Sequence, residues 1–350
     1  MIKKKISING LKFSNRVVVS PMCQYSAKNG CPTEWHYAHL GSLATSGAGM
    51  LTIESTAVNM NGRITHADLC LQNKKQYLSM KKLFIYLKKL SNIPICLQIS
   101  HAGRKGSSNI PWIKKNSPLN KNQSNWKTYS ASSIKKDKGW PNPIELSLKK
   151  IQSIIQDYLK TVRLAKKIGF DGIEIHMAHG YLLHQFISPI SNKRKDIYGG
   201  NLKNRLRLPT LILKNAKKIW PENKILGARI TASDHLKGGI NINDSIFFVK
   251  QLEKIGLHYV CVSSGGILTK TNLKPHKKAF RLKLAEKIKK KTKILVRVSG
   301  NLNYPKILKK TVGKKIDFVA IGRAFLRNSR WIYNNFKSKS IPKQISRGFK

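Results

Sequence analysis

Short apolar runs rich in Val, Ile and Leu recur along the chain, and the intervals between them carry amphipathic patterns. Each run is brief, as expected of a buried strand. The clearest interval is 147–170, where Ile, Tyr, Leu and Val recur at three- and four-residue spacing, which predicts a helix. The eight predicted strands lie within residues 16–22, 50–55, 94–100, 172–178, 225–231, 259–265, 294–300 and 317–324.

Eight strands that alternate with helices indicate a parallel (β/α)8 TIM barrel, a fold of the α/β class. A doubly wound sheet is the alternative, but no G-x-G-x-x-G pattern opens the first helix after a strand. We predict a single domain over residues 1–350, without internal repeats and with a long loop after the third strand.

This loop, residues 103–146, has the length of a lid or a binding excursion. It carries Trp112, Trp126 and Trp140. Tryptophans in such loops more often pack than bind substrate, so we leave these three out of the predicted site.

The composition is that of a globular protein, with 41% hydrophobic residues, 11 Phe, 11 Tyr and 6 Trp. No apolar run reaches the roughly 18 residues that suggest a membrane span. No apolar stretch follows the basic N-terminal cluster, so we expect no secretory signal. The five cysteines are odd in number and form no C-x-x-C pair, which favours free thiols in a reducing, cytoplasmic compartment.

The formal net charge of +52 invites a nucleic-acid interpretation, because Lys and Arg neutralise phosphates. Only 14 of the 67 basic residues are Arg, however, and Arg is the usual choice for phosphate and base recognition. The lysines are spread along the whole chain without a single basic block. With the heavy use of Ile and Asn, this pattern favours compositional drift over a polyanionic partner, so we do not expect nucleic acid to bind.

In a TIM barrel, the chemistry is expected at the carboxyl ends of the strands. Polar residues gather at six of the predicted ends: Ser20, Cys23, Gln24 and Tyr25; Gln98 and His101; His176, His179 and Tyr181; Arg229; Ser299 and Gly300; Gly322 and Arg323. Two imidazoles three residues apart suit a metal, hydrogen bonding to a substrate, or plain packing. No third carboxylate or thiolate ligand stands near them, which disfavours a metal.

Each of these residues also has a structural interpretation. The His pair can be a satisfied structural pair, and Cys23 can be a buried thiol. Arg229 and Arg323 can be ordinary ion-pair residues, although the chain has only 15 acids to pair with its cations.

Four motifs stand at these strand ends: SPMCQYS (20–26), QISHAGRK (98–105), the run from His176 to Arg205, and IGRAF (321–325). Together they resemble the old yellow enzyme family of FMN-dependent ene-reductases. The Cys of the first motif and the short first loop are similar to the bacterial thermophilic-like class, which includes the xenobiotic reductases. The resemblance extends from residue 6 to about 349 and implies one barrel that binds FMN, with NADPH or NADH as reductant.

The resemblance implies that the following residues form the cofactor site: Ser20, Pro21, Met22, Cys23, Ser55, Gln98, Arg229, Gly300, Gly322 and Arg323. Within this set, Gln98 contacts the pyrimidine edge of the flavin. Arg229 lies near N1 and C2=O, where a cation raises the reduction potential. Gly300, Gly322 and Arg323 hold the phosphate.

The resemblance also implies the catalytic and substrate-binding residues. His176 and His179 donate hydrogen bonds to the carbonyl oxygen of an α,β-unsaturated substrate, so that hydride from flavin N5 can reach the β-carbon. Tyr181 then protonates the α-carbon from the opposite face. Tyr25 adds a substrate contact, and Cys23 tunes the flavin without attacking the substrate.

The tail over residues 338–350 contains PKQISRGF (342–349). It resembles a segment of this class that reaches the neighbouring subunit's active site, with Arg347 as its basic tip in contact with substrate. We therefore expect a homodimer or homotetramer. Ile345 stands where the usual tail has an aromatic residue, and a frayed basic terminus is the alternative.

Three alternatives to an ene-reductase stay open. A quinone reductase is one, and a decayed homologue kept as a non-enzymatic binding protein is another. An FMN barrel that reduces bases in RNA, as dihydrouridine synthases do, would explain the charge, but it predicts a proton-donating Cys and a basic RNA-binding domain. We expect a small electrophilic alkene or quinone as substrate, and NADPH rather than NADH, because Lys and Arg near the mouth could hold its extra phosphate.

Overall fold

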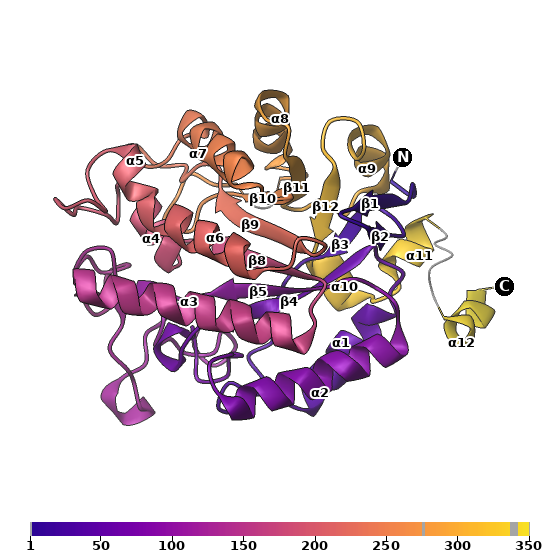
Figure 1. Cartoon of the computed structure of the whole chain (residues 1–350), viewed down its shortest axis with the longest axis horizontal. Helices are drawn as coiled ribbons and strands as arrows, with labels where there is room; N and C mark the ends of the chain where they lie inside the picture. The colour runs from indigo at the N-terminus through magenta and orange to yellow at the C-terminus, as the bar shows by residue number, and fades with distance from the viewer. Residues whose placement is uncertain (1, 275–276, 337–341, 350) are drawn as a thin grey trace.

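The computed structural model describes residues 2–274, 277–336 and 342–349. Its centre is a closed barrel of eight parallel strands in the order β10-β11-β12-β3-β4-β5-β8-β9 (Figure 1). The strands are β3 (Val17–Val19), β4 (Met50–Ala57), β5 (Ile95–Ser100), β8 (Gly172–Met177), β9 (Ile225–Thr231), β10 (Tyr259–Ser263), β11 (Leu295–Ser299) and β12 (Phe318–Ile321). Each overlaps one of the predicted apolar runs, so the predicted (β/α)8 barrel is confirmed.

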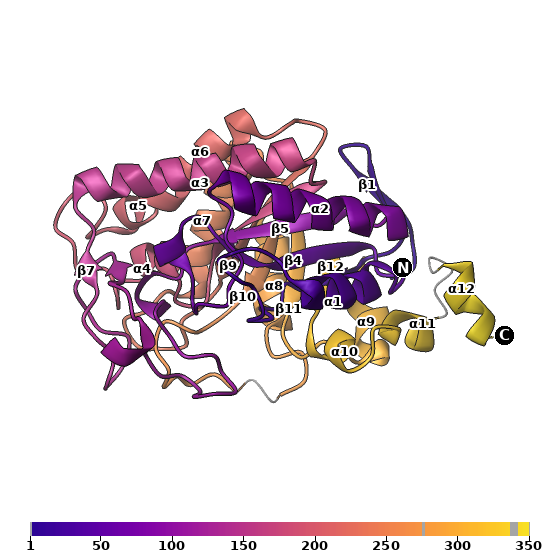
Figure 2. The same cartoon turned by 90° about the horizontal axis from the view of Figure 1, so that it is seen from below.

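Most of the helices surround the strands on the outside, whereas α12 stands apart from the barrel (Figures 1 and 2). The helices are α1 (Glu34–Ala44), α2 (Lys74–Leu90), α3 (Leu148–Ile168), α4 (Leu182–Ile187), α5 (Leu202–Arg205), α6 (Arg207–Ile219), α7 (Ile242–Ile255), α8 (Leu282–Lys291), α9 (Pro305–Thr311), α10 (Arg323–Arg327), α11 (Trp331–Phe336) and α12 (Lys343–Ser346). The helix predicted over 147–170 is α3. Ser147 caps its first turn by accepting from the Lys150 N–H, and Gly169 ends it with a φ of 105°, a conformation that favours glycine.

A short antiparallel hairpin closes the amino-terminal end of the barrel. It consists of β1 (Ile6–Ile8) and β2 (Leu11–Phe13). Phe13 packs into a cluster of buried residues from the strand starts, which includes Val18, Met50 and Phe318. Because the hairpin covers this end, the carboxyl end is left as the place for a ligand.

One layer of the barrel interior is polar and fully buried. The Glu174 carboxylate accepts hydrogen bonds from Gln98 Nε2 at 2.7 Å and from the Tyr259 hydroxyl at 3.0 Å, and it forms an ion pair with Arg297. Tyr259 and Arg297 face the hairpin that closes the barrel. The layer therefore extends from the closed end to Gln98.

The long excursion after β5 contains only short elements: the 3-10 turns Gly103–Lys105 and Lys121–Gln123, and the two-residue strands β6 (Tyr129–Ser130) and β7 (Ile144–Glu145). Arg104 is buried and donates to the carbonyls of Ile134 at 2.9 Å and Ile267 at 3.0 Å. It thus ties the excursion to the loop after β10, which lies beside it in Figure 2.

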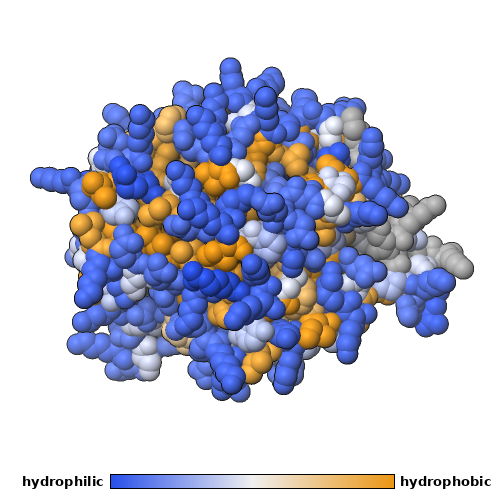
Figure 3. Space-filling model, viewed as in Figure 1, coloured by the Kyte–Doolittle hydropathy of each residue, from blue (hydrophilic) through white to orange (hydrophobic). Residues whose placement is uncertain are grey.

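Hydrophilic side chains are dispersed over the face drawn in Figure 3, among smaller apolar patches. This distribution matches the spread of lysines along the sequence. None of the described helices combines the length and the hydropathy needed to cross a membrane.

Candidate functional site

A cavity of about 440 Å³ opens at the carboxyl end of the barrel. It brings together six residues of the predicted cofactor set: Ser20, Met22, Arg229, Gly300, Gly322 and Arg323. Of the remaining four, Gln98 and Ser55 are buried on neighbouring strands, and Pro21 and Cys23 lie on the segment after β3. None of these four lines the cavity itself.

Four arginines line this cavity: Arg229, Arg281, Arg323 and Arg327. Within the described residues, none of them forms an ion pair with a carboxylate. Arg229 is 8% exposed and donates to Ser299 Oγ at 3.2 Å, and among the described residues its buried Nε has no hydrogen-bond partner. Guanidinium groups without counter-ions favour a multiply charged anion such as a phosphate.

The sequence prediction missed Arg281. Its Nε donates to Ser264 Oγ at 2.9 Å, and burial, followed by the charge of Arg229, lowers its pKa to about 9. Gly300 lies against this side chain with a φ of 139°, and a Cβ there would stand 3.1 Å from Arg281 Cδ. Glycine at 300 therefore allows the backbone and the guanidinium stem to share this wall of the cavity.

The segment after β3 is held by a buried acid. The Gln24 N–H donates to Glu54 Oε2 at 2.9 Å, and Glu54 Oε1 lies 3.3 Å from His36 Nε2. Burial, then Asp68 and Glu54, raise the pKa of Cys23 well above its usual value. The thiol is therefore neutral near pH 7, and it lacks the thiolate that a nucleophile needs.

His176 and His179 lie at the end of β8 with their rings 5.1 Å apart. His179 Nδ1 lies 3.3 Å from His176 Nε2, and His179 Nε2 lies 2.5 Å from Ser263 Oγ. Burial, then the charge of Arg229, lower the pKa of both imidazoles well below 6.5. Each ring is therefore neutral at pH 7 and carries one N–H.

Tyr181 completes this group, with its ring centroid 4.9 Å from that of His176. Burial, then the nearby Cys23 and Asp68, raise the pKa of its phenol well above 10, so the group keeps its proton. Lys105 Nζ lies 5.0 Å from the centre of the Tyr181 ring and donates to the His179 carbonyl at 2.7 Å. Burial, then Lys136 and Arg104, lower the pKa of Lys105 to about 7.

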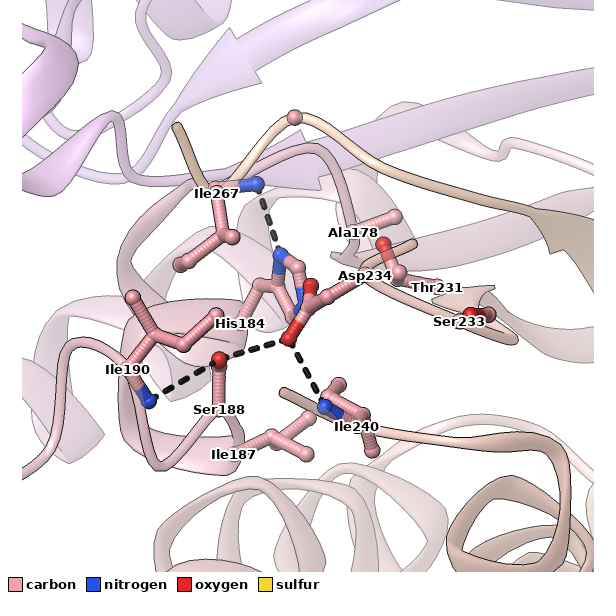
Figure 4. Close-up of polar contacts among 12 residues, drawn as sticks. Ala178, His184, Ile187, Ser188, Ile190, Thr231, Ser233, Asp234, Ile240 and Ile267 are labelled. Atoms are coloured by element: carbon pink, nitrogen blue, oxygen red, sulfur yellow. Dashed lines mark hydrogen bonds and ion pairs between the residues drawn. The ribbon is translucent and has the colours of Figure 1, made fainter. Parts of the chain in front are cut away.

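A buried network that the sequence prediction missed supports the loop between His179 and α4 (Figure 4). The Gly180 N–H donates to His184 Nδ1 at 2.7 Å, and His184 Nε2 lies 3.1 Å from Asp234 Oδ1. Burial raises the pKa of Asp234, but His184 and the Ser188 hydroxyl outweigh it and leave this pKa below its usual value. Ser188 donates to Asp234 and not to His184, so the three residues position the loop and do not form a hydrolytic triad.

The three tryptophans of the long loop differ in their surroundings. Arg63 lies over Trp126, and Lys136 lies over Trp140. Trp112 is 68% exposed, and its ring meets the Tyr25 ring edge-on, with centroids 5.8 Å apart. Trp112 therefore extends the aromatic surface of Tyr25, through a contact between segments that sequence spacing does not reveal.

We expect the change Trp112→Ala to raise KM for a bulky aryl enone such as benzylideneacetone about 2- to 10-fold. This is the loss in binding expected when one contact between aromatic rings is removed. 2-Cyclohexenone, which is smaller, should be little affected. Ile113→Ala is the matched control, because Ile113 is equally exposed and has no ring to offer. Steady-state kinetics with both substrates measure the effect, and equal losses in the two variants would contradict it.

Two other residues that the sequence analysis named fall outside this group. His101 is buried, and its Nδ1 accepts a hydrogen bond from the Gly103 N–H at 3.0 Å. Burial, then Lys150, lower its pKa to about 3, so the imidazole is neutral and serves as a structural residue. Arg347 is exposed and does not line the cavity. Its contact with a neighbouring subunit stays a prediction, and part of the tail before it, residues 337–341, lies outside the described residues.

In the described part of the chain, no three His, Cys, Asp or Glu side chains gather as a metal site.

A profile of the NADH:flavin oxidoreductase / NADH oxidase family matches residues 4–339. The chain belongs to this family. It is the old yellow enzyme family that the four motifs resemble, and it makes the protein an FMN-dependent oxidoreductase that uses a nicotinamide reductant.

Curated relatives match over nearly the whole chain. The NADH:flavin oxidoreductase FG08077 of Gibberella zeae is 36% identical over 340 residues, covering 92% of this chain and 82% of its own. An NADPH dehydrogenase of Listeria monocytogenes is 33% identical over 350 residues, covering 98% of this chain and 97% of its own. An NADPH dehydrogenase of Bacillus subtilis is 33% identical over 345 residues, covering 97% and 94%.

Solved structures share the fold at lower identity. Morphinone reductase in complex with tetrahydroNAD has a TM-score of 0.79 and 20% identity, and the match covers 97% of this chain and 92% of that one. The 2-naphthoyl-CoA reductase complex has a TM-score of 0.85 and 22% identity, and it covers 99% and 52%.

The residues of the cavity, together with Gln98 on β5, fit FMN. The unpaired guanidiniums and the close approach at Gly300 suit a phosphate, and the buried Nε of Arg229 offers one further donor without a partner. Gln98 suits a pyrimidine edge, because Glu174 only accepts hydrogen bonds and so takes the amide NH2. The carbonyl oxygen of Gln98 is thereby left as an acceptor.

Proposed function

We propose that the chain is an NAD(P)H-dependent ene-reductase, which reduces the C=C bond of α,β-unsaturated carbonyl compounds. The observation that carries this proposal is the group formed by His176, His179 and Tyr181. It holds two neutral imidazoles and a protonated phenol together at the carboxyl end of β8. The NADPH dehydrogenase relatives support NADPH as the reductant.

In this proposal the cationic residues hold the cofactor. Arg281 and Arg323 would bind the phosphate, and Arg229 would stabilise the negative charge that the ring gains on reduction. Gln98 offers its carbonyl oxygen to the N–H of the pyrimidine edge. Bound FMN would supply the hydride for the β-carbon of the alkene.

The rim residues act on the substrate. His176 and His179 donate to its carbonyl oxygen and stabilise the negative charge that develops there. Their low pKa values matter because a neutral imidazole donates a hydrogen bond without giving up its proton. Tyr181 supplies a proton to the α-carbon, and its phenol is fit for that role because it stays protonated at pH 7.

We expect the change Arg281→Met to weaken FMN binding about 10- to 100-fold, since a hydrogen bond to a charged group contributes about 1.5–3 kcal/mol. Quenching of FMN fluorescence on binding to the apoprotein measures the dissociation constant. Arg16→Met is the control, because Arg16 bonds the Asp317 carbonyl at the start of β12, away from the cavity. Equal affinity in the two variants would remove Arg281 from the cofactor site.

The choice of oxidant tests the proposed function against its alternatives. The enzyme is first reduced with NADPH without oxygen, and its reoxidation is followed with 2-cyclohexenone, benzoquinone or tRNA. We expect fast reoxidation by the enone and none by tRNA. Reoxidation by benzoquinone alone would favour a quinone reductase, and reoxidation by tRNA would favour an RNA-base reductase.

A further inference from the structure

Ser263 lies at the end of β10, opposite the two imidazoles, and it is fully buried. Its hydroxyl lies 2.5 Å from His179 Nε2, which makes it the hydrogen-bond partner of that ring on the side away from His176. A hydroxyl can either donate or accept a hydrogen bond, unlike a backbone group or a carboxylate. What Ser263 does is therefore decided by where the proton of His179 resides.

The protons of the pair can be assigned from their partners. His176 Nδ1 accepts from the Ala178 N–H at 3.1 Å, so the single proton of this neutral ring is on Nε2. That N–H points at His179 Nδ1, 3.3 Å away, which must then be the acceptor. His179 therefore carries its proton on Nε2 and donates it to Ser263. In this resting arrangement, both imidazole N–H groups are already used.

A carbonyl substrate needs a different arrangement. An oxygen placed between His176 Nε2 and His179 Nδ1 can receive two hydrogen bonds only if His179 carries its proton on Nδ1. We propose that Ser263 is the positioning residue that permits this change, accepting from His179 Nε2 in the resting enzyme and donating to it when a carbonyl oxygen is bound. The ring loses the Nε2 proton to water and takes one from water at Nδ1, so its charge is unchanged.

The ring has few other ways to meet a substrate. His179 has a φ of 60°, its N–H donates to Thr231 Oγ1 at 3.1 Å, and its carbonyl accepts from Lys105. A Cβ on Gly266 would stand 2.7 Å from His179 Cα, which shows how closely the loop after β10 packs against it. The backbone is thus fixed, and a second proton is disfavoured by burial and by Arg229. A change of tautomer remains.

This inference rests on the proposed function, but its first test does not depend on turnover. Nitrogen-15 NMR of histidine-labelled, oxidised holoenzyme distinguishes the two tautomers. We expect His179 to be protonated on Nε2 alone, and on Nδ1 after saturation with 2-cyclohexenone, under conditions in which the flavin absorption shows that the cofactor stays oxidised. The same tautomer in both states, with ligand binding seen as a shift in flavin absorption, would overturn the inference.

The second test uses variants of Ser263. Reoxidation of the reduced enzyme by 2-cyclohexenone should slow about 10-fold in Ser263→Ala, a smaller loss than removal of a direct oxyanion donor. Reoxidation by ferricyanide, which needs no carbonyl contact, should be unchanged and serves as the internal control. Ser263→Thr keeps the hydroxyl and should restore most of the rate.

The two tests separate the inference from the proposed function. An alanine variant as fast as the parent with the enone would overturn the role of Ser263 and leave the ene-reductase proposal standing. A parent enzyme that ignores enones, but shows the change of tautomer on binding one, would overturn the proposed function alone.

Discussion

The change Tyr181→Phe is expected to slow the reoxidation of the reduced enzyme by 2-cyclohexenone by about 10²- to 10⁴-fold, the usual contribution of a general acid. The Tyr181 phenol keeps its proton, and its ring centroid lies 4.9 Å from that of His176; phenylalanine keeps this ring while removing the proton. Stopped-flow absorption of the flavin measures the rate. Reduction by NADPH should be little affected, because that step needs no proton from Tyr181.

Tyr25→Phe is the matched control, because Tyr25 also presents a phenol to the site but is assigned only a contact. Its rate should fall less than 10-fold, the size expected for one neutral hydrogen bond. Because burial holds the pKa of Tyr181 above 10, the rate in the parent enzyme should not fall between pH 6 and 9 through loss of this proton. Equal rates for Tyr181→Phe and the parent would exclude Tyr181 as the proton donor.

The second large effect concerns stability. The change Glu174→Gln is expected to lower the free energy of unfolding by about 3–5 kcal/mol, because it leaves the fully buried Arg297 without its counter-ion. Urea unfolding of the apoprotein, followed by circular dichroism, measures the loss without any contribution from FMN. The double change Glu174→Gln with Arg297→Met should recover much of it, since no unpaired charge then remains in the barrel.

Glu145→Gln is the control for this experiment. Glu145 also pairs with an arginine, Arg194, at 3.2 Å, but its side chain is 49% exposed. An exposed ion pair contributes at most about 1 kcal/mol, so this variant should unfold almost like the parent. A loss as small as this in Glu174→Gln would show that the polar layer does not stabilise the barrel.

The barrel strands could be predicted because parallel strands covered by helices are apolar along their whole length. Their carboxyl ends then gave the rim, and the structure brings His176, His179 and Tyr181 together there. The hairpin β1–β2 could not be predicted in this way, because strands of three residues are too short to show a period.

The missed site residues share a different cause. Arg281 stands at the start of α8, far along the chain from the end of β10, and its side chain lines the cavity. Trp112 meets Tyr25 across the excursion, and Asp234 reaches His184 from the loop after β9. Such pairings depend on tertiary geometry. A single sequence shows which residues are polar, but it does not show which loops meet.

The measurement that tests the central claim most directly is an anaerobic titration of the purified protein followed by its absorption spectrum. The proposal predicts flavin absorption that bleaches with one equivalent of NADPH and returns with one equivalent of 2-cyclohexenone, with cyclohexanone as the product. Flavin that bleaches but is not reoxidised by the enone would contradict the ene-reductase proposal, although the flavin barrel would stand. A protein that binds no FMN, even after reconstitution, would contradict the whole account of the site.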